Sequence, residues 1–155
     1  MAHPSEVERV YREQSEKLWA SLVVWSGDRE VSSDAVAEAF AQVLRRVDDI
    51  RDLRAWVWKS AFRIAAGEMS GHSSERITDR AIAEPGYEQV DEADHLRRAL
   101  ARLPNRQRAV LVLRYYADLG LRDIAAVLAI SYPTAGVHLS LGRRRLKEIL
   151  EEQDG

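Results

Sequence analysis

The stretch that decides the fold runs from Leu119 to Lys147 and reads LGLRDIAAVLAISYPTAGVHLSLGRRRLK. Ser131 is placed to cap a helix by accepting a bond from an amide about three residues on. Pro133 falls in the first turn of that helix, where its missing N–H costs nothing. The segment before Ser131 carries an apolar stripe at i, i+3, i+4 and i+7, which predicts an amphipathic helix. That stripe consists of Leu121, Ile124, Ala125 and Leu128.

The second helix of this pair has two distinct faces. Its expected buried stripe consists of Ala135, Leu139, Gly142 and Leu146. Its expected outer face carries Tyr132, Thr134, Gly136, Ser140 and the run Arg143-Arg144-Arg145. Two helices joined by a tight turn, the second ending in arginines, are typical of a DNA-binding helix-turn-helix. An ordinary helical hairpin, with the arginines as a solvated helix end favoured by the helix dipole, is the alternative on this stretch alone.

Composition limits the class of protein. The 155 residues allow one domain or two small ones. No stretch approaches the roughly 18 consecutive apolar residues of a membrane span, and the N-terminus lacks a cationic-then-apolar signal segment. Cysteine is absent, which excludes disulfides, thiol catalysis and cysteine-ligated zinc. A cytoplasmic protein is therefore expected.

Charge is distributed unevenly along the chain, whose formal net charge is −2. Counted by segment, residues 1–70 carry −2, residues 71–92 carry −4 and residues 93–155 carry +4. Only the C-terminal third therefore has the electrostatic character of a phosphate-binding surface.

Three helices are predicted before residue 70. The first covers residues 5–26 and ends at Gly27 as a left-handed stop. The second begins near Ser32 or Ser33 as its cap, and the third begins near Asp52. The second helix has the cleanest apolar periodicity, formed by Val36, Ala39, Phe40, Val43, Leu44 and Val47. Its opposite face carries Asp34, Glu38, Gln42 and Arg45.

The remainder predicts a linker and a second helical domain. Residues 71–92 lack a sustained period, contain Pro85-Gly86 and are acidic, so they are expected to form a flexible linker. Helices are expected over 93–103 and from Asn105 onward. The second of these is apolar enough to be the central, buried helix of the domain. We therefore predict an all-α chain of two small helical domains, 1–70 and 93–155, the second with the helix-turn-helix.

The motifs taken together resemble the extracytoplasmic-function class of bacterial RNA polymerase sigma factors. The family's gly-asp-arg and asp-leu-x-gln-glu-x-phe patterns of region 2 are matched by residues 27–29 and 34–40, and its arg-ala-trp-leu by residues 54–57. Its region 4 signatures leu-pro-x-x-gln-arg and leu-arg-tyr are matched by residues 103–108 and 113–115. Leu121-x-x-Ile124-Ala125 and Ser131-x-x-Thr134 match the two helices of its DNA reader. The resemblance spans nearly the whole chain.

The resemblance implies a role for each domain. In region 2, Asp34, Glu38 and Gln42 match the face that binds the largest-subunit clamp of core RNA polymerase. The third helix would hold the minus-ten promoter element as single strand through Arg54, Trp58, Lys59 and Arg63, with Trp56 expected in the core. Region 4 would read the minus-thirty-five element through Ser131, Thr134, His138, Ser140, Arg143 and Arg144. The family also implies an anti-sigma partner, a free monomer and no cofactor.

This chain departs from the family in its reading helix. Gly136 and His138 replace the usual lysine and arginine, and Val137 and Leu141 fall on a face that should be wet. An arginine or lysine contact to guanine is therefore lacking early in this helix.

Two other classes of protein stay open. One is a helix-turn-helix transcriptional regulator with an N-terminal sensing or dimerisation domain, and the other is a helical module that sequesters a partner. An enzyme is not expected, because the four histidines are scattered and no glycine-rich phosphate loop follows a strand.

Overall fold

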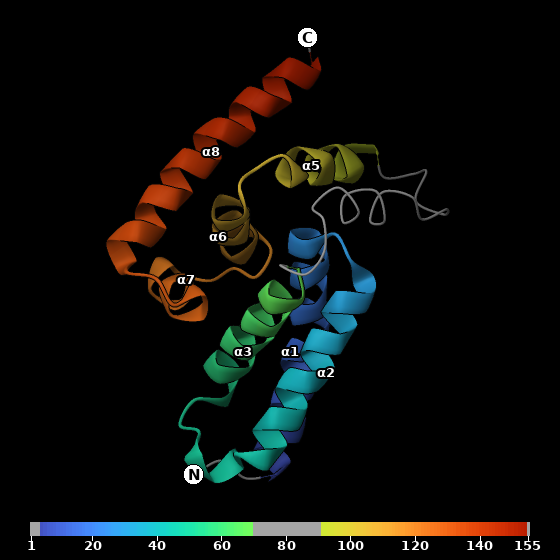
Figure 1. The fold of residues 1–155 in the computed structure, drawn as a ribbon, viewed down its shortest axis with the longest axis vertical. Helices are drawn as coiled ribbons and strands as arrows, with labels where there is room; N and C mark the ends of the chain where they lie inside the picture. Colours follow the sequence, from blue (N-terminus) through green and yellow to red (C-terminus); the bar gives the residue numbers. More distant parts are fainter. Residues whose placement is uncertain (1–3, 70–90, 155) are drawn as a thin grey trace.

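A computed structural model describes residues 4–69 and 91–154, and every regular element in those ranges is helical, as predicted (Figure 1). The elements form two helical domains. The first contains α1 (Pro4–Ser26), α2 (Arg29–Arg45), a short 3-10 helix η1 (Val47–Asp49) and α3 (Leu53–Met69). The second contains α5 (Asp91–Ala101), α6 (Asn105–Tyr115), α7 (Leu121–Leu128) and α8 (Tyr132–Asp154).

The first domain is a bundle in which α1, α2 and α3 pack on one another. Its fully buried side chains include Leu18, Leu22, Val43 and Val57, which come from all three helices. Four positions of the predicted stripe are buried and Val47 is partly buried, but Leu44 is 62% exposed, so its placement in the core was wrong. Leu44 follows Val43 by one residue, and a step of about 100° around the helix carries its side chain off the packed face.

Asp28 rather than Ser32 or Ser33 caps α2. The backbone N–H of Val31 donates to Asp28 Oδ1 at 3.0 Å, so α2 starts earlier than predicted. Ser32 is buried inside the helix, where its hydroxyl donates to the Asp28 carbonyl at 2.7 Å. The preceding Gly27 has φ 72°, which confirms the predicted left-handed stop after α1.

The second domain is built around α6, whose Val110, Leu111, Val112 and Leu113 are buried. Both α7 and α8 pack on α6, and α5 packs on α8. The predicted linker lies outside the described residues except for its last two positions, which begin α5. The observed α5 therefore starts two residues before the predicted helix.

The two domains pack against each other. The helix α7 lies on α3, and α6 contacts α1 (Figure 1). The indole N–H of Trp25, at the end of α1, donates to the carbonyl of Asn105, at the start of α6, at 3.2 Å. The buried apolar side chains of both domains form one cluster. This contact between domains was not predicted from the sequence.

Candidate functional site

The turn between α7 and α8 has the geometry of a helix-turn-helix. Ala129 ends α7 in the left-handed conformation with φ 55°, and the two helices diverge by 103°. Helix-turn-helix pairs cross at about 90–120°. The Thr134 backbone N–H donates to Ser131 Oγ at 3.2 Å, which confirms Ser131 as the cap of α8. Ser131 Oγ also donates to Thr134 Oγ1 at 2.7 Å, so the two hydroxyls are held together at the start of α8.

The predicted outer face of α8 is exposed except at Gly136, which is partly buried. Ala135, Leu139 and Gly142 are buried against the domain. The exposed side chains form a stripe along the helix: Thr134, Val137, Ser140, Leu141 and Arg144. His138 is only half-exposed, and its buried Nδ1 has no hydrogen-bond partner among the described residues. His138 therefore presents less of its ring to a ligand than the residues of the stripe do.

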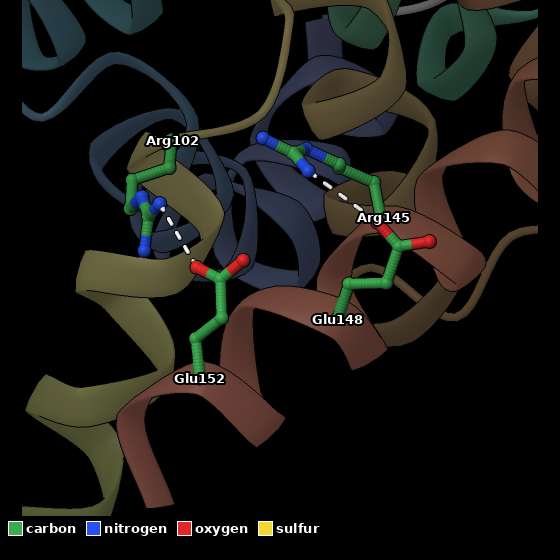
Figure 2. Close-up of polar contacts among 4 residues, drawn as sticks. All are labelled: Arg102, Arg145, Glu148 and Glu152. Carbon is green, nitrogen blue, oxygen red and sulfur yellow. Dashed lines mark hydrogen bonds and ion pairs between the residues drawn. The ribbon is translucent and has the colours of Figure 1, made fainter. Parts of the chain in front are cut away.

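The three consecutive arginines of α8 differ in their surroundings. Arg145 pairs with Glu148 at 3.4 Å, and nearby Glu152 of α8 pairs with Arg102 of α5 at 3.3 Å (Figure 2). Arg143 lies over the ring of Tyr115, with its guanidinium carbon 5.8 Å from the ring centroid. Arg143 and Arg144 are both exposed, and among residues 4–69 and 91–154 neither has an ion pair. Exposed, unneutralised guanidinium groups are suited to phosphate contacts.

Arg108 of α6 has a structural role in the second domain. Arg108 is only 8% exposed, and its guanidinium donates to the Ala101 carbonyl at 3.1 Å and to the Asn105 side chain. Burial lowers the pKa of Arg108 from its ordinary value. These bonds tie the end of α5 to the start of α6, so Arg108 holds the connection between them.

On α2, the acidic side chains proposed for polymerase binding lie on the surface. Asp34 and Glu38 are exposed one helical turn apart, and Gln42 is half-buried. Glu38 Oε1 accepts from Arg45 at 3.0 Å and from Gln42 at 3.2 Å. Both bonds are local and exposed, and exposed ion pairs contribute only about 0–1 kcal/mol, so a partner can displace them.

On α3, the two tryptophans are placed opposite to the prediction. Trp58 is 1% exposed, and its indole N–H donates to Gln14 Oε1 at 2.9 Å, so its assignment to a base-stacking surface was wrong. Its ring stacks on Phe62 with centroids 6.2 Å apart. Trp56, expected in the core, is only half-buried. The apolar content of α3 is spread around the helix, so periodicity could not decide which tryptophan faces inward.

The cations of α3 lie where the two domains meet. Arg54, Lys59 and Arg63 are exposed. Lys59 and Arg63 line a cleft of about 800 Å³ that Arg106 of α6 also lines. A second cleft, of about 630 Å³, lies between α3 and α7 and is lined by Arg54 and Trp56. Sequence reasoning missed Arg106, because its position beside α3 depends on the packing of the domains.

Metal and membrane sites were also sought in the described chain. Residues 4–69 and 91–154 contain no group of three or more His, Asp or Glu side chains that could hold a metal ion. Within the same ranges no single helix is long and apolar enough to cross a membrane. The pair α7 and α8 meets the criteria of length and composition only when joined across its 103° bend.

Known proteins resemble the chain both in sequence and in fold. Residues 94–146 match the family described as Sigma-70, region 4. The RNA polymerase sigma factor SigV of Bacillus subtilis (strain 168) is 25% identical over 127 residues, which cover 78% of this chain and 76% of SigV. The RNA polymerase sigma factor YlaC of the same organism is 21% identical over 96% of this chain and 94% of its own length.

Two solved structures share the fold. One is CnrH in complex with the cytosolic domain of CnrY, with a TM-score of 0.74, 17% identity, and coverage of 97% of this chain and 90% of that chain. The other is the sigma factor RpoE in complex with the anti-sigma factor NepR from Bartonella quintana, with a TM-score of 0.70 and 19% identity. It covers 93% of this chain and 96% of that one.

Proposed function

We propose that this chain, a member of the extracytoplasmic-function class of bacterial sigma factors, binds core RNA polymerase through α2 and directs it to promoters through both domains. The observation that carries the proposal is the region 4 match, which falls on a helix-turn-helix whose outer face is exposed. Initiation factors of this kind recruit and position the polymerase. The chain itself is therefore proposed to have no catalytic role and to act in the cytoplasm, where the polymerase works.

The polymerase contact is assigned to Asp34, Glu38 and Gln42. Two carboxylates one turn apart on a helix project from the same face and can pair with arginines across an interface. Asp34 is exposed on α2, and the bonds of Glu38 are exposed ones within the same helix. A basic surface of the polymerase can therefore reach both carboxylates without rearranging the core.

The minus-ten contact is assigned to the exposed cations of α3, which are Arg54, Lys59 and Arg63. We replace Trp58 in this role by the half-buried Trp56, which lines the same cleft as Arg54 and Lys59. An aromatic ring beside cations suits single-stranded DNA, because bases stack on the ring while the cations follow the backbone.

The minus-thirty-five contact is assigned to α8. The hydroxyls of Ser131, Thr134 and Ser140 can bond phosphates or base edges. The guanidinium groups of Arg143 and Arg144 can bind phosphates of the DNA backbone. His138 keeps a secondary place in this assignment because its side chain is partly buried. The domains accordingly correspond to region 2 over 1–70 and region 4 over 93–155, joined by residues 71–92.

An anti-sigma protein is proposed as a further partner. The two solved structures described above are both complexes, one of them explicitly of a sigma factor with an anti-sigma factor. The exposed face of α2 would bind polymerase constantly unless another protein or the packing of the second domain covered it.

The test is co-migration of purified core RNA polymerase with the full chain on size exclusion at moderate salt. We expect the wild type to co-migrate and Asp34→Arg to elute alone, because the arginine would repel a basic surface while leaving the fold intact. Glu151→Arg is the matched control, since Glu151 is equally acidic and exposed but lies at the far end of α8.

Two results count against the proposal. If the wild type fails to bind, the N-terminal domain does not act as region 2, and a regulator or sequestering module becomes the better account. If Asp34→Arg binds as well as Glu151→Arg, the α2 face is not the polymerase contact.

A further inference from the structure

Two apolar side chains stand in the middle of the exposed face of α8. Val137 is 55% exposed and Leu141 is 40% exposed. They are four residues apart, so they lie next to each other on the same side of the helix. Contact with water is unfavourable for exposed aliphatic side chains, so a partner that covers them gains binding free energy. The position of this pair, at the centre of the reading helix, points to the ligand of that helix.

The polar side chains around the pair lack the cations that select guanine. From Ser131 to Gly142 the helix has no lysine or arginine, which are the side chains that bind the O6 and N7 atoms of guanine. A Cβ at Gly136 would meet nothing within 4 Å, so no neighbouring side chain covers this part of the face. The hydroxyls of Thr134 and Ser140 flank the pair and can bond any base edge.

Charge around the pair favours DNA over protein as the occupant. Arg143 and Arg144 are exposed on the next turn of α8, and Arg122 is exposed at the start of α7. The Arg122 guanidinium lies 5.2 Å from the ring centroid of Tyr132, at the other end of the pair. An apolar centre with cations at both ends matches a major groove, where base edges lie between two phosphate backbones.

We propose that Val137 and Leu141 read the C5 methyl groups of thymines in the major groove, so that the upstream element of the promoter is specified by thymines rather than guanines. Thymine alone among the four bases presents a methyl group there. This inference rests on the proposed function and names the base class that α8 selects. Arg143 and Arg144 then set affinity and register, while the apolar pair supplies the discrimination.

The experiment uses holoenzyme assembled from core RNA polymerase and the full chain. Holoenzyme first selects binders from a random duplex library, and the enriched upstream element is then synthesised with uracil replacing thymine at one position at a time. Uracil differs from thymine only by the lost methyl group. We expect one or two positions at which the replacement weakens binding about fourfold, the effect of about one buried methyl.

Variants assign the effect to the two side chains. The double variant Val137→Ser/Leu141→Ser should bind the thymine and uracil duplexes equally, while each single variant should lose only the discrimination that its own side chain provides. Circular dichroism checks that the exposed substitutions leave the helices intact. Arg144→Ala is the control, since it should weaken both duplexes by the same factor and flatten the log–log salt dependence by about 0.9.

Three results would overturn the inference. If uracil replacement leaves wild-type binding unchanged at every upstream position, the helix does not read thymine methyl groups. Discrimination that survives in the double serine variant would assign the readout to other residues. A wild-type dimer that Val137→Ser converts to a monomer in sedimentation would make this face a contact between copies. Failure of the wild type to bind core polymerase, measured separately, would instead count against the proposed function.

Discussion

Trp58 is the largest side chain that the described chain buries completely. It packs on Phe62 and satisfies its only polar atom through Gln14. A buried indole removes a large apolar area from water, and its N–H must find a partner inside the fold. Trp58 therefore stabilises the first domain. Of the two tryptophans of α3, only Trp56 is exposed enough for a ligand to reach.

The first prediction concerns these two tryptophans. Trp58→Ala should lower the free energy of unfolding by about 3–5 kcal/mol, because it leaves a large cavity in the bundle. Urea unfolding followed by circular dichroism measures the loss. Trp56→Ala is the matched control and should cost clearly less, since Trp56 is only half-buried. Equal losses for the two variants would contradict the assignment of Trp58 to the core.

At the scale of the element, α8 uses its two internal glycines differently. A Cβ at Gly136 would meet nothing within 4 Å, whereas one at Gly142 would lie 3.3 Å from Cγ and Cδ1 of Leu111. Gly142 thus lets α8 approach α6 closely. Gly136 lies on the opposite, open side of α8, where no described part of the protein requires a glycine.

The second prediction follows from that difference. Gly136→Ala should stabilise the protein by about 0.4–1 kcal/mol, because alanine restricts the unfolded chain and fits the helix without strain. Gly142→Ala, the matched control on the same helix, should gain less or lose stability, since its methyl group presses on Leu111. Thermal unfolding of both variants measures the effect. A gain at Gly142 as large as that at Gly136 would show that the α6–α8 contact is looser than described.

At the scale of the whole molecule, the two domains are joined through α7 and α3. Val127 shows this most clearly, because it lies outside the apolar stripe of α7 and is nevertheless only 6% exposed. It lines both clefts between α3 and the second domain. Its burial thus depends on the contact between the domains as well as on the helix itself.

The third prediction tests that contact. Val127→Lys should open the molecule, because burying an ammonium group without a partner is costly. X-ray scattering should give a radius of gyration near 15 Å for the wild type, the value for a compact chain of this length, and a clearly larger one for the variant. Ala126→Lys is the control, since Ala126 is exposed on the same helix. An unchanged radius for Val127→Lys, with native helicity, would contradict the packed arrangement.

Most of the fold could be predicted from short stretches of sequence. The stripe of α8, the Ser131 cap and the Gly27 stop depend on residues within one or two turns, and all three are confirmed. The two errors have different origins. Trp58 is buried because α1, distant in sequence, supplies Gln14. The start of α2 was misplaced for a local reason, because Asp28 and the two serines are all suitable cap residues and the apolar pattern does not choose among them. The roles of the site residues rest on the family resemblance and on their exposure.

The most direct test of the central claim is transcription from genomic DNA by core RNA polymerase with and without the full chain, with transcript starts mapped. The account predicts a small set of discrete start sites that need the chain, that are lost with Asp34→Arg and that persist with Glu151→Arg. Start sites that are the same with and without the chain would contradict its assignment as a sigma factor.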